Sequence, residues 1–282
     1  MKHVVMFSGG IASWMTARLV INEHGPADTV LLFADVKGDP TNTHCGEDTD
    51  CYRFINETAN KFGTRLVIVQ DGRNIWQVFK DHQFIGNSRL APCSHDLKQR
   101  PCRTWLDTHC DPTVTTVYVG IDFTEMHRLA AVTSAYHPFT LEAPLTKPPY
   151  VDKDSMLKIC RADGITPPRM YASGWPHANC QGACVRAGQA QWRKLLSLHP
   201  DIYAYHENEE QNLREHLNKD VSILRDRTGL EPVPLTLRTF RERIQNGQQS
   251  LFNLEDFNYE WGGCGCFTDY EKPDPETIGE TA

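Results

Sequence analysis

The sequence predicts an α/β fold, in which a doubly wound, mostly parallel sheet is followed by a helical, cysteine-containing C-terminal extension. Apolar runs of strand length occur at 4–7, 28–35, 65–71 and 115–120. Stretches with helical spacing of apolar residues lie between these runs, and such alternation is typical of βαβ units. The run 28–35 is almost continuously apolar, as expected of a strand that is buried on both faces.

The helices are predicted from the same spacing of apolar residues. The first begins just after Gly10, and the second follows the acidic segment that starts at Glu47. The stretch 200–217 is rich in charged residues and is expected to form a solvated amphipathic helix. The other expected helices lie over 74–84, around Trp105, over 152–162, from about Arg186, and over 233–244 after a proline-rich turn.

The chain is expected to divide into three regions. Residues 1–185 should form the α/β domain, and residues 186–271 a helical region that closes a cysteine cluster. The last segment, 272–282, is acidic and contains proline, which predicts a disordered tail.

The composition limits the class of protein. Hydrophobic residues make up 40% of the 282 residues, which is enough for a sizeable core. No apolar stretch approaches the roughly 20 residues of a membrane span, and the N-terminus has no signal-peptide pattern. The formal net charge of −7 disfavours indiscriminate binding to a nucleic-acid backbone. We therefore expect a cytoplasmic protein with no membrane partner.

The loop after the first strand has features of a phosphate-binding site. Ser8-Gly9-Gly10 ends the strand, and Ser13 falls in the first turn of the next helix. Glycines let the backbone approach an anion, free amides at the helix start point toward that anion, and serines add hydroxyl donors. The spacing and the missing lysine exclude a Walker loop. The alternative interpretation is an ordinary strand-to-helix turn that uses glycine.

Five short motifs in a fixed order make the interpretation more specific. Together they resemble the PP-loop ATP pyrophosphatase, or adenine nucleotide α-hydrolase, superfamily, and within it the phosphoadenosine phosphosulfate (PAPS) reductase-like branch. The resemblance covers about residues 3–185 and implies a Rossmann-like (HUP-type) sheet. The motifs are Phe7-Ser8-Gly9-Gly10 with Ser13, Phe33-Ala34-Asp35, Glu47-Asp48-Thr49, Cys93-Ser94 with Lys98 and Pro101, and Gly120-Ile121 with Glu125 and Arg128.

The resemblance also implies a site for ATP, or for a PAPS-like adenine nucleotide, with Mg²⁺. Lys98 and Arg128 would supply positive charge over the phosphates, because a lysine offers a point charge and an arginine a planar fork. Taken alone, each of these two cations is better explained as a solvated side chain or a surface ion pair, and only its placement at a strand end reverses that preference. The nucleotide-binding set would be Ser8, Gly9, Gly10, Ser13, Asp35 and Gly120, with Ser13, Lys98 and Arg128 as catalytic residues.

Two pairs of cysteines predict a metal site. Cys180 and Cys184 are separated by three residues, and Cys264 and Cys266 are separated by one glycine. Four thiolates can bind a [4Fe-4S] cluster or Zn²⁺, and the spacing differs from the C-x-x-C of zinc ribbons, which favours the cluster. The alternative is that these are reduced cysteines without a metal.

Two further residues near these motifs have candidate roles. Cys93 precedes Lys98 and is the one other cysteine that we single out for a functional role. His177 precedes Cys180 and is interpreted as a ligand, a hydrogen-bond donor or an ordinary structural residue.

The function that these predictions favour is ATP-dependent adenylation of an acceptor with release of pyrophosphate, coupled to sulfur transfer. The acceptor would be a tRNA, a DNA or a small molecule, and a sulfur-donor protein would be a second partner. One alternative is thiol-dependent reduction of PAPS or APS. The family's reductases use Glu-Cys-Gly-x-His, whereas this chain has Gly263-Cys264-Gly265-Cys266-Phe267, which disfavours that reaction. The other alternative is a nucleotide-binding or sensing protein without turnover.

Overall fold

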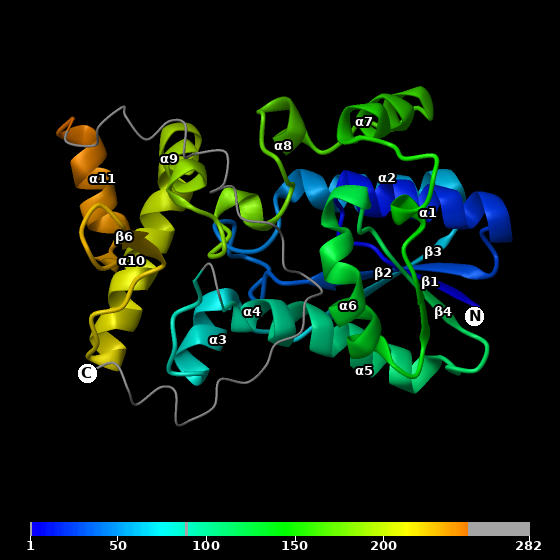
Figure 1. Ribbon diagram of the computed structural model, residues 1–282, viewed down its shortest axis with the longest axis horizontal. Helices are drawn as coiled ribbons and strands as arrows, with labels where there is room; N and C mark the ends of the chain where they lie inside the picture. The colour runs from blue at the N-terminus through cyan, green and yellow to red at the C-terminus, as the bar shows by residue number, and fades with distance from the viewer. Residues whose placement is uncertain (1, 88–89, 248–282) are drawn as a thin grey trace.

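The computed structural model describes residues 2–87 and 90–247, and its centre is a five-stranded parallel sheet. The strand order is β3-β2-β1-β4-β5, and all four neighbouring pairs are parallel. The predicted α/β class and the parallel sheet are therefore confirmed (Figure 1). The strands are β1 (His3–Met6), β2 (Thr29–Asp35), β3 (Arg65–Gln70), β4 (Thr116–Val119) and β5 (Thr140–Glu142).

Helices cover both faces of the sheet. On one face lie α1 (Ile11–His24), α2 (Thr49–Phe62) and α7 (Lys153–Ala162), and on the other lie α5 (Arg100–His109) and α6 (Leu129–Tyr136) (Figure 1). Successive side chains of a strand point to opposite faces. Val5 of β1 thus packs toward α1 and α2, whereas Val4 packs toward α5 and α6. Because helices pack against both faces, the sheet is doubly wound.

The strand order reverses between β1 and β4. The chain first builds outward through β2 to β3 and then returns to place β4 on the other side of β1. In open α/β sheets, ligands bind outside the carboxyl ends of the strands at such a reversal. The segment 7–10 follows β1 and the segment 120–128 follows β4, so both lie at that point.

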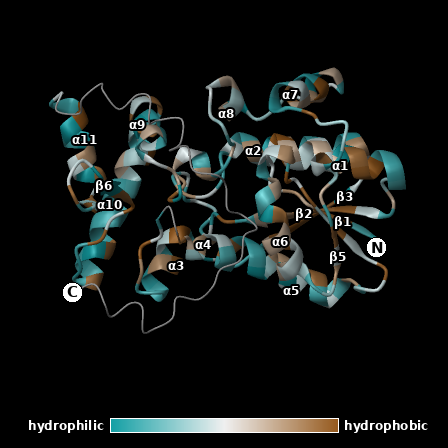
Figure 2. Cartoon of the chain, in the orientation of Figure 1, coloured by the Kyte–Doolittle hydropathy of each residue, from teal (hydrophilic) through white to brown (hydrophobic). Residues whose placement is uncertain are grey.

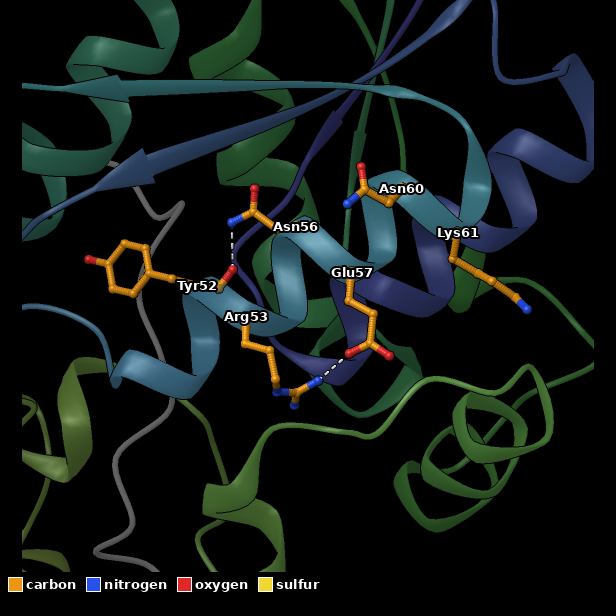
Figure 3. A pocket seen from close by; sticks show the side chains of 6 residues that line it. All are labelled: Tyr52, Arg53, Asn56, Glu57, Asn60 and Lys61. Atoms are coloured by element: carbon orange, nitrogen blue, oxygen red, sulfur yellow. Dashed lines mark hydrogen bonds and ion pairs between the residues drawn. The ribbon is translucent and has the colours of Figure 1, made fainter.

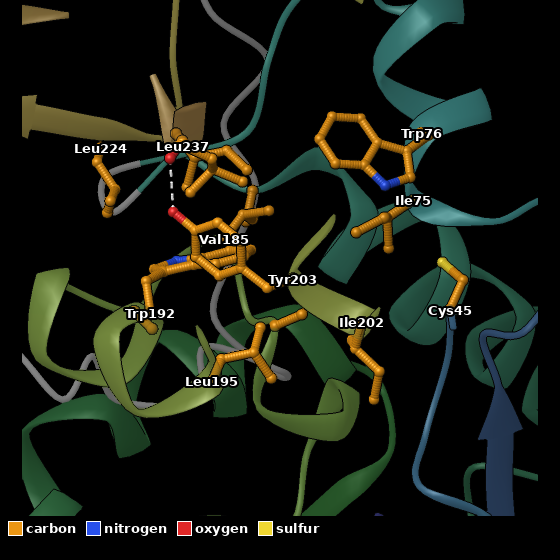
Figure 4. Packing of buried hydrophobic residues seen from close by; sticks show 14 of the residues in the cluster. Cys45, Ile75, Trp76, Val185, Trp192, Leu195, Ile202, Tyr203, Leu224 and Leu237 are labelled. Atoms are coloured by element: carbon orange, nitrogen blue, oxygen red, sulfur yellow. Dashed lines mark hydrogen bonds between the residues drawn. The ribbon is translucent and has the colours of Figure 1, made fainter. Parts of the chain in front are cut away.

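A second core joins the C-terminal region to the sheet domain. It is built around Trp76, Trp192, Tyr203 and Phe240, and Figure 4 shows Trp76 and Tyr203 pointing into the same apolar cluster. The elements around this core are α3 (Ile75–Asp81), α4 (Pro92–Ser94), the π-helical turn His95–Gln99, α8 (Arg169–Ala172), α9 (Gln189–Leu198), α10 (Pro200–Leu217), the antiparallel strands β6 (Leu224–Asp226) and β7 (Val233–Leu235), and α11 (Leu237–Gln245).

The helix predicted over 200–217 is confirmed as α10, whereas the helix predicted over 233–244 is wrong at its start. Val233–Leu235 is strand β7, and the helix begins only at Leu237, because Thr236 caps it by accepting a hydrogen bond from the Thr239 amide. Helix α10 is not simply solvated, although Figure 2 shows mostly hydrophilic residues along it and along α11. Glu207 and Glu210 on its inner face are buried, because each of them has hydrogen-bonding partners.

The fifth strand, β5, was not predicted. It has only three residues, Thr140–Glu142, and one neighbour, β4. No helix of the described residues is long and apolar enough to cross a membrane.

Candidate functional site

The loop that connects β1 to α1 is shaped by its glycines. Gly9 has a φ of +75°, and a Cβ built on it would lie 2.3 Å from the Cys51 sulfur of α2. Both the positive φ and the close approach exclude larger residues. Gly10 is extended and is the N-cap of α1, so the amides of the first helical turn are directed into the space beyond the loop.

The hydroxyl groups of the loop form a short chain of hydrogen bonds. Ser8 Oγ donates to Ser13 Oγ at 3.2 Å, and Ser13 Oγ donates to the Gly10 carbonyl at 2.8 Å. The Tyr171 hydroxyl of α8 accepts a hydrogen bond from the Ile11 amide at 3.0 Å. The Ile11 amide, which an anion at the helix start would otherwise use, is thus already bonded to a phenol oxygen.

Gly120 is needed because β4 ends against the first turn of α1. A Cβ on Gly120 would lie 2.7 Å from the Ser13 nitrogen and 2.8 Å from the Ser13 Cα. These are backbone atoms, which cannot yield as a flexible side chain would. Gly120 therefore brings the two strand ends of the reversal point together, a structural role that sequence reasoning did not assign to it.

A cavity of about 310 Å³, here called the loop cavity, opens at this point. Its walls come from the β1–α1 loop, the 3₁₀ turn Phe123–Arg128, the start of α7, and the segment after α8. Of the predicted site residues, it brings together Ser8, Gly10, Ser13, Gly120 and Arg128. Asp35 and Lys98 do not line it, and Gly9 faces Cys51 instead.

Arg128 is held in place by its own turn. Its guanidinium forms an ion pair with Glu125, three residues earlier, and its side chain is 12% exposed. Asp122 caps the turn by accepting a hydrogen bond from the Thr124 amide at 2.8 Å. The Nε of Arg128 is buried and has no hydrogen-bond partner among the described residues, which is unusual for a buried donor.

Asp35 lies at the end of β2, as predicted. Its Oδ1 accepts hydrogen bonds from the Tyr52 hydroxyl at 2.6 Å and from the Lys37 amide at 3.0 Å. These bonds fix the turn that follows the strand.

Lys98 lies in a different place from Arg128. It lines a small, apolar cavity of about 40 Å³ together with Cys93, Cys180 and Cys184. This second cavity is here called the thiol cavity. Asn179 lines both the thiol cavity and the loop cavity, so the two are neighbours.

A buried carboxylate neutralises Lys98. Glu47 Oε1 accepts a hydrogen bond from Lys98 Nζ at 2.9 Å, and Glu47 Oε2 accepts one from the Cys180 amide at 2.6 Å. Burial disfavours the charged form of Lys98, but the Glu47 carboxylate together with the Cys180 and Cys184 sulfurs outweighs burial and raises the Lys98 pKa. The pair thus anchors the start of the cysteine segment to the turn before α2.

The thiols of the cavity differ in acidity. The hydrogen bond between Cys180 and Cys184 lowers the pKa of Cys184 and raises that of Cys180. Burial raises the pKa of Cys93 to about 12. Cys184 is therefore the thiol of the three that most readily becomes a thiolate, the form that binds metals and acts as a nucleophile.

Two of the four predicted cysteine ligands lie within the described residues. Cys180 and Cys184 lie together, whereas Cys264 and Cys266 lie outside the described residues. Cys93 is an additional thiol at the same cavity, and its nearness in sequence to Lys98 was the only signal for it. Within residues 2–87 and 90–247, no three His, Cys, Asp or Glu side chains are arranged to hold a metal ion. The described thiols alone therefore do not make a metal centre.

Sequence reasoning missed three residues of the loop cavity. Lys153 and Tyr171 were assigned no role there, and His177 was considered only in relation to the cysteines. Each comes from a segment far from the loop in sequence, so local motifs carry no signal for it.

A third hollow lies elsewhere on the surface. It has a volume of about 810 Å³ and is bounded by side chains of a single helix, α2 (Figure 3). Its arginine, Arg53, is paired with Glu57 and Asp50. The hollow has no connection to the predicted motifs.

No family model and no curated protein sequence matches the chain. Among solved structures, the chain is similar to the phosphoadenylyl-sulfate (PAPS) reductase of Candida auris, crystallised as a phosphate complex. The two are 13% identical, with a TM-score of 0.43, and the match covers 62% of this chain and 79% of the reductase chain.

Proposed function

We propose that this chain is a PP-loop enzyme of the PAPS reductase-like branch that binds ATP, or a related adenine nucleotide, in the loop cavity. The observation that carries the proposal is the cavity itself. At the strand-order reversal it combines a glycine loop, two serine hydroxyls, a helix N-terminus and Arg128. Such donors stabilise phosphate groups, and stabilise them most where negative charge develops.

The reaction that we propose is adenylation. An oxygen nucleophile of the acceptor would attack the α-phosphorus, forming a new O–P bond, and the bond to the β-phosphate oxygen would break so that pyrophosphate leaves. Ser13 and the amides of α1 would hold the phosphoryl oxygens, and Arg128, which lines the same cavity, would supply positive charge beside them. Mg²⁺ bound to the nucleotide would neutralise charge on the leaving group.

The second half of the proposal is sulfur transfer to the adenylated acceptor, with AMP as the leaving group. It is supported by the position of the thiol cavity, which shares Asn179 with the loop cavity. Lys98 belongs to this half, since it lies among the thiols and is paired with Glu47. A sulfur-donor protein would supply the sulfur, and the acceptor would be a tRNA, a DNA or a small molecule.

A metal or cluster at the thiol cavity remains part of the proposal. Cys180 and Cys184 would hold it, with Cys93 beside them and with Cys264 and Cys266 as the remaining predicted ligands. A [4Fe-4S] cluster is favoured over Zn²⁺, and it would supply a site for binding or activating sulfur.

The test measures ATP binding by calorimetry and pyrophosphate release in the presence of tRNA, DNA and small-molecule acceptors. Ser13→Ala should weaken both, because the hydroxyl at the helix start is lost. Ser134→Ala is the matched control, since Ser134 is exposed on α6. Binding without turnover for every acceptor would favour a sensing protein. Sulfite production from PAPS with thioredoxin would instead favour a reductase.

A further inference from the structure

Neither of the two cations predicted for the phosphates gives the loop cavity an unpaired positive charge. Lys98 is outside the cavity, and Arg128 has its charge matched by Glu125. Asp122 is engaged by the amide and hydroxyl of Thr124. A bound polyphosphate needs positive charge that is not already neutralised by a neighbouring carboxylate, because burying an anion without a partner is costly.

Lys153 has such a charge. It stands in the first turn of α7, half-buried, and lines the loop cavity. Its ammonium donates to the Pro176 carbonyl at 2.8 Å, and no carboxylate of the described residues lies within ion-pair distance of it. An ammonium has three donors, so two remain for other acceptors.

His177 stands beside this lysine. It also lines the loop cavity, and its imidazole has no hydrogen-bond partner within residues 2–87 and 90–247. Burial, together with the charges of Lys153 and Arg128, lowers its pKa to about 4, while Asp122 acts in the opposite direction. The ring is therefore neutral near pH 7 and can offer one N–H donor and one acceptor.

The chain links the two residues directly. Pro176, which accepts the hydrogen bond from Lys153, is the neighbour of His177, so the lysine fixes the segment that carries the imidazole. That segment runs from the end of α8 to Cys180, and α8 lies next to α7 in the chain order and on the same side of the sheet (Figure 1). Neither residue belongs to any of the sequence motifs.

We propose that Lys153 and His177 form a phosphate-oxyanion subsite of the loop cavity. It takes a phosphoryl group of the bound nucleotide, with Lys153 as the charge partner and His177 as a neutral hydrogen-bonding partner. The inference rests on the proposed function, because it assigns residues to the nucleotide of that function.

The test measures the affinity of the full chain for MgATP and for inorganic triphosphate at two salt concentrations. Lys153→Met should weaken binding of both about tenfold or more and should reduce the salt dependence. Lys158→Met is the matched control, because Lys158 is exposed on the same helix, and it should leave both affinities unchanged. Lys153→Arg should restore most of the loss, and His177→Asn should weaken binding severalfold.

The outcomes separate this inference from the proposed function. If the wild type binds MgATP and Lys153→Met binds it as well as Lys158→Met does, the subsite is wrong and the nucleotide function stands. If triphosphate binds in a Lys153-dependent manner and MgATP binds no better, the subsite stands and the adenine-nucleotide function fails. Absence of binding by both ligands overturns both proposals. Thermal unfolding of each variant, unchanged in midpoint, excludes misfolding. If Lys153→Met unfolds, Lys153→Gln replaces it as the test, with the same loss of affinity expected.

Discussion

At the scale of single residues, the loop cavity depends on glycines that fill different roles. Gly9 and Gly120 have no room for a Cβ, because side-chain or backbone atoms of other elements would lie within 3 Å of it. Gly10 does have room, since the nearest atom to its Cβ would be the Tyr171 hydroxyl at 3.5 Å. Two glycines therefore serve packing, whereas the third keeps the cavity open.

We predict that Gly120→Ala and Gly10→Ala separate these roles. Gly120→Ala should lower the free energy of unfolding by about 1–3 kcal/mol, because the new methyl group overpacks against the Ser13 backbone. Gly10→Ala should leave stability nearly unchanged but weaken nucleotide binding, because its methyl group enters the loop cavity. Urea denaturation and calorimetry measure the two effects. Equal losses of stability in both variants would contradict the assignment.

The loop residues could be predicted from sequence because their chemistry is local. Ser8, Gly10 and Ser13 lie within six residues of one another, and their spacing directly sets the geometry of a strand–loop–helix turn. Lys153 and His177 could not be predicted in this way. Their role depends on α7 and α8 folding back over the end of β1, which is a tertiary contact.

At the scale of elements, the four longer strands were predicted and the short ones were not. A continuous apolar run such as 28–35 reflects burial on both faces, which sequence shows directly. The three residues of β5 and of β7 are too few to show a period. Strand β7 contains Pro234, which is tolerated there because, among the described residues, β7 pairs with β6 alone.

The buried face of α10 escaped prediction for a different reason. Its charged residues suggest solvent, but Glu210 accepts hydrogen bonds from the amides of Ile223 and Leu237, and Glu207 pairs with Arg241. Partners supplied by later segments make burial of these carboxylates acceptable. The same face carries His206, whose Nδ1 accepts a hydrogen bond from the Trp76 indole of α3 at 3.1 Å.

We predict that His206 makes the contact between α10 and α3 sensitive to acid. Burial lowers its pKa to about 3, so the folded protein holds the ring neutral. Below about pH 6.5 the unfolded chain binds a proton at His206 that the folded chain does not bind. Stability therefore falls as pH decreases, by about 1.4 kcal/mol per pH unit.

The measurement is denaturant unfolding of the wild type and His206→Gln at pH 7 and pH 5. The variant lacks the ionisable ring, so the stability difference between the two proteins should shrink by about 2 kcal/mol at the lower pH. His127→Gln, which changes an exposed histidine, serves as the control and should show no such change. A difference that stays constant with pH would refute the role of His206.

At the scale of the whole molecule, two cavities lie side by side at the carboxyl end of the sheet. One has the donors of a phosphate site, and the other has three thiols and a buried ion pair. Sequence reasoning placed Lys98 over the phosphates because a motif alone cannot show which way a side chain turns. In the structure, Lys98 lies apart from Arg128 and is paired with Glu47.

We predict that metal content follows the thiol cavity. Protein purified without oxygen should contain iron and acid-labile sulfide, and Cys180→Ser and Cys184→Ser should lose both. Cys93→Ser and Cys264→Ser test the two remaining sources of ligands. Cys110→Ser is the matched control, because Cys110 packs against a different apolar cluster near α5 and does not line the thiol cavity. Zinc without sulfide would indicate a structural zinc site rather than a cluster. Metal retained in Cys180→Ser would show that the metal is bound elsewhere.

Asn179 lies where binding at one cavity can affect binding at the other. It is one peptide bond from Cys180 and bounds both cavities. If binding at the thiols shifts Asn179, it changes the affinity for nucleotide, and reciprocity requires the nucleotide to change the affinity of the thiols by the same factor. The redox or metal state of the protein and its nucleotide load are then coupled variables, so each affinity has meaning only at a stated occupancy of the other site.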